Sequence, residues 1–226
     1  SAEGKVRCVI LRYFNAAGAH DSLLIGEDHH PETHLIPLIL QVANNLRDSV
    51  NIYGSDYDTR DGTCVRDYIH VLDLAEAHIL AAQYLEEGGK SEAFNLGSGK
   101  GYTVREIIEA CRTVTGHQIP VREVERREGD PPQLIASSKK AESVLGWKRQ
   151  YTSIEDIVRT AWVWYAKFPY GYGEISYKEI LQVMYGKHRR NELRKWHVIA
   201  SEPTTEDEPA KQGFWSTVKR RFQEST

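Results

Sequence analysis

The stretch DGTCVRDYIHVLDLA, residues 61–75, places a glycine turn, a short apolar run and the start of an amphipathic helix in direct succession. A strand that leads into a helix is the building unit of α/β proteins, so this stretch decides the fold class. Arg66 stands between the turn and the apolar run. Because its planar guanidinium presents a fork of donors, an arginine held by turn and strand is suited to binding phosphate.

The composition bounds the class of protein. With 226 residues, 40% of them hydrophobic, the chain can form one large domain or two small ones. A net charge of −3 argues against nucleic acid as a partner, because such proteins carry a strongly basic face. No apolar run has the length of a membrane span, so a membrane partner is not expected. Three separated cysteines, Cys8, Cys64 and Cys111, predict free thiols and a cytoplasmic setting.

Strand and helix patterns alternate along residues 6–167. Strands are expected at residues 6–13, 51–53, from 65, 93–96 and 119–124. Helices are expected at residues 33–46, 73–85, 103–115, 139–145 and 153–167. The first strand is nearly continuous in apolar character, which is typical of a parallel strand buried on both faces. The class is therefore α/β with at least part of a parallel sheet.

Sequence signals mark where several of these helices begin and end. Thr33 and Ser153 are expected N-caps, Thr103 and Glu106 form a capping box, and Gly146 is expected to end the fourth helix. Beyond residue 173 the chain becomes rich in charge, with two helical candidates at 177–195 and 211–222. We therefore predict one unit over residues 1–173 and an appended charged tail over 174–226.

Four residue types suited to a nucleotide stand near expected strand ends. Asn15 follows the first strand, where ligands of open α/β sheets bind, although an asparagine there can also stabilise its own turn. Arg66 and Arg127 can clamp a diphosphate from two loops, and Asp130 can accept from ribose hydroxyls. The alternative is a solvated loop of surface ion pairs. Tyr53 can stack on a flat base, although an aromatic residue at a strand end is also a common core residue.

Two patterns that suggest other cofactors are not supported by their spacing. His29, His30 and His34 lie close together, but neither cysteine nor carboxylate spacing completes a metal site, so no metal is expected. The glycines at 97, 99 and 101 match neither a dinucleotide loop nor a phosphate loop, and a tight turn is expected there.

Taken together, six segments resemble the UDP-glucose 4-epimerase family of extended short-chain dehydrogenases/reductases. They are LRYFNAAGAH (11–20), HLIPLILQVA (34–43), IYGSDYDTRDGTCVRDYIHVLDLAEAH (52–78), FNLGSGKGYTV (94–104), RREGDPPQLIASSKKAESVLGW (126–147) and FPYGYG (168–173). The resemblance covers residues 6–173. It implies an incomplete Rossmann-type sheet with the small C-terminal substrate-binding lobe of that family.

The resemblance implies roles for the matching residues. The substrate is expected to be a UDP-sugar, with Asn15 near its phosphates and Arg66 and Arg127 on the diphosphate. The remaining roles fall on the ribose (Asp130), the uracil (His34, Leu35, Asn51 and Tyr53) and the NAD cofactor with the sugar (Tyr13 and Phe14). Some family members carry a tyrosine at the position of Leu134, near the 2-position of the sugar. We expect the smaller leucine to make a roomier pocket that admits N-acetylhexosamines.

In the family, NAD takes a hydride from C4 of the sugar and returns it to the other face, while a tyrosine of a Tyr-x-x-x-Lys pair acts as base. This sequence contains neither that pair nor a G-x-x-G-x-x-G or G-x-G-x-x-G motif. We therefore expect no catalytic residue here, but the C-terminal, substrate-binding part of an epimerase. Alone it is expected to bind NAD poorly, to be inactive and to aggregate through an incompletely covered sheet.

Two alternatives remain open at this point. One is a non-catalytic nucleotide-sugar-binding or interaction protein, and the other is a different sugar-nucleotide enzyme of the same fold. Whether a partner chain supplies a complementing N-terminal half, and which oligomer forms, is not decided by the sequence.

Overall fold

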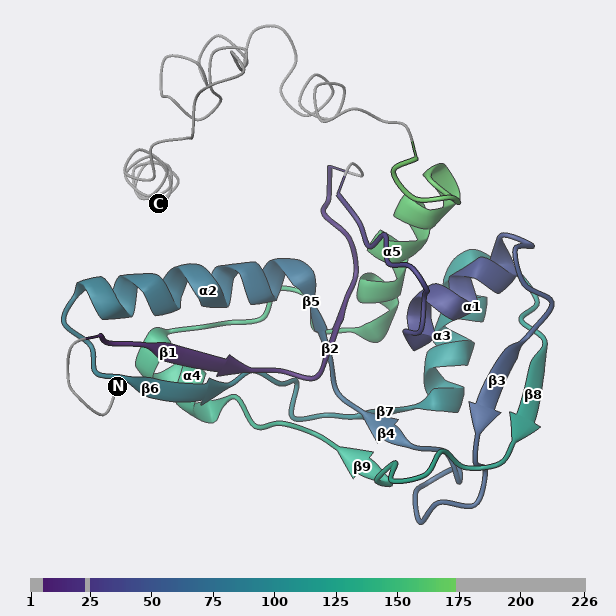
Figure 1. Ribbon diagram of the computed structural model, residues 1–226, viewed down its shortest axis with the longest axis horizontal. Coiled ribbons are helices and arrows are strands. Elements are labelled where there is room, and N and C mark those ends of the chain that lie inside the picture. Colours follow the sequence, from purple (N-terminus) through teal and green to yellow (C-terminus); the bar gives the residue numbers. More distant parts are fainter. Residues whose placement is uncertain (1–5, 23–24, 174–226) are drawn as a thin grey trace, which may run out of the picture. The chain divides into compact units, whose positions relative to one another are not determined.

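The computed structural model describes residues 6–22 and 25–173 (Figure 1). The helices are α1 (Leu35–Ala43), α2 (Val71–Glu86), α3 (Val104–Thr115), α4 (Lys139–Leu145) and α5 (Ile154–Lys167). The strands are β1 (Val9–Arg12), β2 (Asn15–Ala17), β3 (Val50–Tyr53), β4 (Val65–Arg66), β5 (Tyr68–His70), β6 (Glu92–Asn95), β7 (Tyr102–Thr103), β8 (Val121–Val124) and β9 (Gln133–Leu134).

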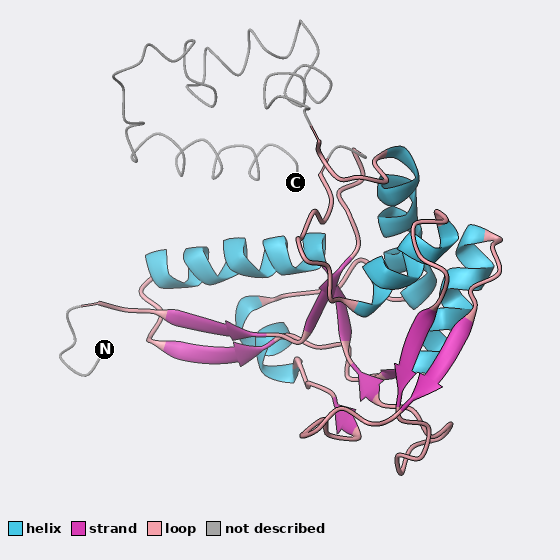
Figure 2. Cartoon of the chain, turned by 45° about the vertical axis from the view of Figure 1, so that its right-hand side comes forward, coloured by secondary structure: helices cyan, strands magenta, loops and turns pink. Residues whose placement is uncertain are grey.

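Most strand pairs are parallel, which confirms the predicted α/β class. Strand β1 pairs with β6, β2 with β5 and β3 with β8, each in parallel. Strand β4 lies between the antiparallel β7 and the parallel β9. Helices separate most of these strands along the chain, and Figure 2 shows the helices in cyan and the strands in magenta. The pairs join segments far apart in sequence, so the fold rests on long-range contacts.

Two apolar clusters hold this part of the chain together. The larger one packs α1, α3 and α5 against β2 and β3, with Ile39, Ile107 and Trp164 fully buried. The smaller one places α2 and α4 against β1 and β6, around the fully buried Phe94 and Trp147. Burying an aromatic side chain removes a large apolar surface from water. Trp164 in the larger cluster, and Phe94 and Trp147 in the smaller one, therefore contribute strongly to stability.

The first strand differs from the prediction. We expected residues 6–13 to be buried on both faces, but β1 is limited to Val9–Arg12 and is covered on one face only. Val9 and Leu11 pack against the α2–α4 cluster, whereas Ile10 on the opposite face is 54% exposed. Among the described residues only β6 pairs with β1, so the other edge of β1 has no strand partner in these ranges.

Two helix starts also differ, and a side chain explains each case. Helix α1 begins after His34 rather than Thr33, because the Glu32 carboxylate accepts from the backbone N–H groups of Thr33 and His34, both at 2.7 Å. Helix α2 begins after His70, whose Nδ1 accepts from the N–H of Leu72 at 3.1 Å.

The other predicted helix signals are confirmed. Thr103 and Glu106 form the reciprocal capping box of α3, Gly146 ends α4 in the left-handed conformation, and the Ser153 side chain caps α5. None of the helices within residues 6–22 and 25–173 has the length and apolar character needed to cross a bilayer. By its internal contacts the chain divides into Ser1–Gly173 and Glu174–Thr226. The helical segments predicted at 177–195 and 211–222 lie outside the described residues.

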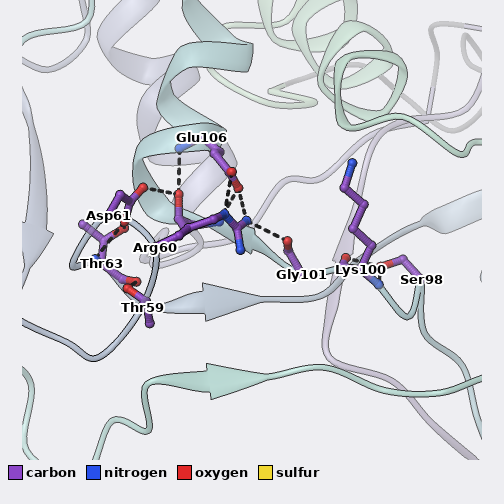
Figure 3. A network of polar contacts seen from close by, with 9 residues as sticks. Thr59, Arg60, Asp61, Thr63, Ser98, Lys100, Gly101 and Glu106 are labelled. Atoms are coloured by element: carbon purple, nitrogen blue, oxygen red, sulfur yellow. Dashed lines mark hydrogen bonds and ion pairs between the residues drawn. The ribbon is translucent and has the colours of Figure 1, made fainter.

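A polar network ties the loop before β4 to the start of α3 (Figure 3). Arg60 donates to both carboxylate oxygens of Glu106 and, at 2.9 Å, to the carbonyl of Gly101. One Asp61 oxygen accepts from the N–H and hydroxyl of Thr63, and the other accepts from the buried Thr103 hydroxyl at 2.5 Å. The loop that leads to Arg66 is therefore fixed at both its backbone and its side chains.

Replacing Asp61 by Asn tests this network through pH. Burial raises the pKa of Asp61, but hydrogen bonds from Thr103 and Thr63 lower it by more, to below its ordinary value of 3.8. A carboxylate with a lowered pKa stabilises the fold above the unfolded-state value and loses this contribution as pH falls toward the folded-state value. We expect Asp61→Asn to cost about 1–3 kcal/mol of unfolding free energy near neutral pH and to flatten its acid dependence.

The measurement is urea unfolding at several pH values between about pH 6 and about pH 3. Asp58→Asn, in the same loop and exposed, is the matched control and should behave like the parent chain. An Asp61→Asn curve parallel to the parent curve over this range would contradict the network.

Candidate functional site

One cavity of about 240 Å³ collects most of the predicted site residues. Its walls come from the start of β2, the N-terminus of α1, β3, β4 and the loop that follows β8. Of the ten predicted site residues, eight line it: Asn15, His34, Leu35, Asn51, Tyr53, Arg66, Arg127 and Asp130. They come from segments up to more than a hundred residues apart, so the fold itself brings them together.

The two other predicted residues lie outside the cavity. Leu134 is half-buried on β9, directly opposite Arg66 in the β4–β9 register. Tyr13 lies in the turn between β1 and β2, 41% exposed, with its ring edge-on to His78 at 6.2 Å between centroids.

Arg66 is the most strongly positioned cation of the cavity. Gly62 in the preceding turn has φ of 82°, and a Cβ there would lie 2.2 Å from the carbonyl oxygen of Ser55, so the turn requires glycine. The Arg66 guanidinium donates to Asp130 Oδ1 at 2.5 Å and to the carbonyl of Val65 at 2.8 Å. Its side chain is 14% exposed. This guanidinium lines the cavity, and an anion that takes the place of Asp130 can use the same donors.

The consecutive arginines after β8 turn to different partners. The Arg127 guanidinium lies over the Tyr53 ring at 3.9 Å from its centroid, inside the cavity. Arg126 instead lies over the buried Tyr57 ring at 4.1 Å and donates to Asp56 Oδ1 at 2.6 Å, outside the cavity lining. Side-chain hydrogen bonds from Asn51, and then from Arg127, lower the pKa of Tyr53. Of these two neighbours, Arg127 therefore lines the cavity, whereas Arg126 makes structural contacts outside it.

The charge of the cavity comes out clearly positive. Its ionisable lining consists of Arg47, Arg66 and Arg127 with a single carboxylate, Asp130, and the imidazole of His34. Sequence reasoning missed Arg47, which follows α1 in an exposed turn, because no local motif marks it. The cavity lining therefore has a formal excess of two positive charges. This excess matches the two negative charges of a diphosphate bridge.

Asn15 serves the fold and faces the cavity at the same time. Its side-chain amide donates to the carbonyl of Asp67 at 3.0 Å, and its own N–H donates to the same oxygen at 3.2 Å. One N–H of the side-chain amide thus serves the β2–β5 connection, and the second N–H and the amide oxygen are the groups that can donate to or accept from a ligand.

The sequence spacing indicated no carboxylate partners for the histidines before α1, but the structure places two carboxylates beside them. The His34 Nδ1 lies 2.8 Å from a Glu27 oxygen and 2.9 Å from a Glu32 oxygen, and His29 lies nearby. His34 also lines the cavity and directly precedes α1, so this cluster stands at one wall of the cavity.

For a nicotinamide cofactor the described residues offer only two exposed aromatic side chains at the end of β1. Tyr13 and Phe14 are both exposed in the turn after β1, where a flat ring can stack. The glycine-rich turn at residues 97–101 is not free for phosphates, because the N–H of Ser98 donates to the Asp67 carboxylate and Gly97 packs on Ala136. The residues described here do not by themselves make a site for NAD.

The fold, parallel strand pairs with a helical lobe around a cationic cavity, is that of an incomplete Rossmann-type extended short-chain dehydrogenase/reductase. Residues 1–97 match the NAD dependent epimerase/dehydratase family. A UDP-glucose 4-epimerase of Halalkalibacterium halodurans is 58% identical over 164 residues, which is 73% of this chain and 49% of that protein.

Solved structures give the same result. A crystal structure of a UDP-glucose 4-epimerase matches with TM-score 0.74 and 51% identity, covering 76% of this chain and 53% of the other. The epimerase of Bifidobacterium longum in complex with NAD+ and UDP matches with TM-score 0.71 and 42% identity, over 75% of this chain and 50% of that one. Residues 1–97 belong to the NAD dependent epimerase/dehydratase family, and the chain is similar to UDP-glucose 4-epimerases. It spans about half the length of these relatives.

Proposed function

We propose that this chain holds the UDP-sugar-binding half of an NAD-dependent UDP-glucose/UDP-galactose 4-epimerase, an isomerase of galactose metabolism. The observation that carries the proposal is the cavity lining, which contains three arginines, one carboxylate and the half-buried Tyr53 ring beneath Arg127. A diphosphate needs cationic donors and a flat base needs an aromatic or apolar wall, and residues of both kinds line the cavity.

The division of labour follows from the side-chain chemistry. Arg66 and Arg127 bind the diphosphate through charge-assisted hydrogen bonds, and Asp130 accepts from the ribose hydroxyls. His34 and Leu35 on one wall and Asn51 and Tyr53 on the other hold the uracil. In this structure Arg66 is paired with Asp130 and Arg127 covers Tyr53. Ligand binding therefore exchanges these contacts for contacts with UDP.

NAD is the cofactor of the proposed reaction, and when bound it accepts and returns the hydride at C4 of the sugar. We propose that Tyr13, which is exposed in the turn after β1, contacts it. The residues of this chain bind and orient the substrate. The base is proposed to come from a tyrosine–lysine pair outside this sequence, which contains no Tyr-x-x-x-Lys. The three free thiols support a cytoplasmic setting.

The open face of β1 favours one further element of the proposal. Parallel sheets are covered on both faces, yet Ile10 is 54% exposed within the described residues. A complementing N-terminal half that pairs with β1 and covers Ile10 would complete the sheet. A non-catalytic nucleotide-sugar-binding protein is the second candidate, favoured by the same absence of a catalytic pair in the sequence.

Calorimetric titration with UDP tests the binding role. We expect Arg66→Ala and Arg127→Ala each to weaken UDP binding about tenfold to a hundredfold, because each removes a charge-assisted hydrogen bond to phosphate. Arg126→Ala is the matched control, since this neighbouring arginine lies on Tyr57 and Asp56. It should leave the affinity within about twofold of the parent.

Circular dichroism of each variant verifies that the fold is retained, which matters most for Arg66 because its removal leaves Asp130 unpaired. Equal losses for Arg126→Ala and Arg127→Ala, or no loss in either cavity variant, would show that UDP does not bind in this cavity.

The substrate range is tested at Leu134. We expect the chain to bind UDP-N-acetylglucosamine as well as UDP-glucose, and Leu134→Tyr to weaken only the former, because the larger ring occupies the space near the 2-position. Leu134→Met, which conserves volume, is the control. Unchanged binding of both ligands to Leu134→Tyr would remove Leu134 from the sugar site.

The purified chain is expected to show no conversion of UDP-galactose to UDP-glucose in the presence of NAD, because it has no Tyr-x-x-x-Lys base. The assay is the coupled oxidation of UDP-glucose, with a full-length epimerase as positive control. Turnover by this chain alone would overturn the division of labour proposed above.

A further inference from the structure

Two carboxylates converge on one ring nitrogen in the segment before α1. The His34 Nδ1 lies 2.8 Å from Glu27 Oε1 and 2.9 Å from Glu32 Oε1. The single hydrogen that Nδ1 can carry cannot point at both oxygens along good hydrogen-bond directions. Two carboxylate oxygens and a second imidazole therefore lie around this one nitrogen.

The second imidazole belongs to His29. Its Nδ1 lies 3.8 Å from the same Glu32 oxygen, and its ring centroid is 5.2 Å from that of His34. One ligand atom from each of His29, Glu32 and His34 can be chosen so that all three lie within 4.8 Å of one another. Ligand atoms around a tetrahedral Zn²⁺ with bonds of about 2.0–2.2 Å are separated by roughly 3.3–3.6 Å. The observed distances lie on both sides of this range.

The Glu32 carboxylate is held before any ion arrives. It accepts from the backbone N–H groups of Thr33 and His34 at 2.7 Å each, and its side chain is only 6% exposed. The Tyr165 hydroxyl of α5 lies 3.5 Å from its other oxygen. The indole N–H of Trp164 donates to the carbonyl of Glu27 at 3.2 Å, so α5 anchors both acidic residues of the cluster.

We propose that His29, Glu32 and His34, whose ligand atoms lie mutually close, form a binding site for one zinc ion at the wall of the cavity, with Glu27 beside His34 as the fourth donor. Two neutral imidazoles and two carboxylates are a donor set that suits Zn²⁺, and the two negative charges are balanced by a divalent cation.

The site ties the segment before α1 to helix α1 itself. His34 is both a ligand and the residue from which α1 starts, and its side chain lines the cavity. Zinc therefore fixes one wall of the cavity without taking part in any reaction. The site is independent of the proposed function, because its occupation is measured without a nucleotide.

The test is calorimetric titration of the untagged, chelator-treated 226-residue chain with zinc chloride. We expect one zinc per chain, weakened by at least about tenfold in His29→Gln and in Glu27→Gln, and a negligible response to magnesium chloride, because imidazole nitrogen favours zinc. His30→Gln is the matched control. His30 adjoins His29, is 82% exposed and contacts Asp28 at 3.2 Å, and its loss should leave zinc binding unchanged.

Thermal unfolding provides the second measurement. Zinc should raise the unfolding midpoint of the parent chain and of His30→Gln, but not that of His29→Gln. All variants should unfold at similar temperatures in chelator, which verifies that they fold. Because His29 is about half exposed, with 49% of its side chain accessible, its variant decides the matter if Glu27→Gln is unstable. Absence of zinc binding by the parent chain, or equal binding by His29→Gln and His30→Gln, overturns the proposal.

Discussion

A single buried carboxylate, that of Asp67, joins the parts of this structure that meet at the site. Only 1% of the residue is exposed. Its oxygens accept from the N–H of Ser98 at 2.9 and 3.1 Å and from the N–H of Ala136 at 3.1 Å, while its own carbonyl accepts twice from Asn15. Each of these N–H groups would cost about 1–3 kcal/mol if left unpaired in the interior. One residue thus links β2, the turn after β6 and the segment after β9.

Arg66 precedes Asp67 in the chain, and the arrangement around the cavity follows from that neighbourhood. The hydrogen bonds of Asp67 and the glycine turn at Gly62 fix the backbone on both sides of Arg66. They therefore restrict the directions in which the Arg66 side chain can point. It meets Asp130, which comes from the loop after β8, and opposite it Arg127 lies on Tyr53. The Asp130 carboxylate on Arg66 is the kind of contact that a diphosphate would make, and the Arg127–Tyr53 contact occupies the ring on which a base would stack. These contacts stabilise the arginines of the cationic cavity.

Local sequence signals predicted what depends on neighbours in the chain, and failed where distant contacts decide. The capping box at Thr103 and Glu106 and the glycine after α4 were visible because their partners lie within a few residues. Eight of the ten predicted site residues line the cavity. The residue types near strand ends and in loops indicated five of them, and the family resemblance added His34, Leu35 and Asn51. The start of α1 was expected at Thr33, and this miss is local in sequence, because the residue types alone do not show that the adjacent Glu32 side chain accepts from the N–H groups of Thr33 and His34. Arg47 in the cavity and Glu27 beside His34 depend on tertiary packing, and no motif marks them.

The central claim is that UDP binds where the Arg66–Asp130 and Arg127–Tyr53 contacts now stand. The most direct measurement is a crystal structure of this chain grown with UDP. The account predicts the diphosphate between the guanidinium groups of Arg66 and Arg127, the uracil against Tyr53 and Leu35, and Asp130 turned to the ribose. A nucleotide bound elsewhere on the chain, with the Arg66–Asp130 pair intact at its present 2.5 Å, would contradict it.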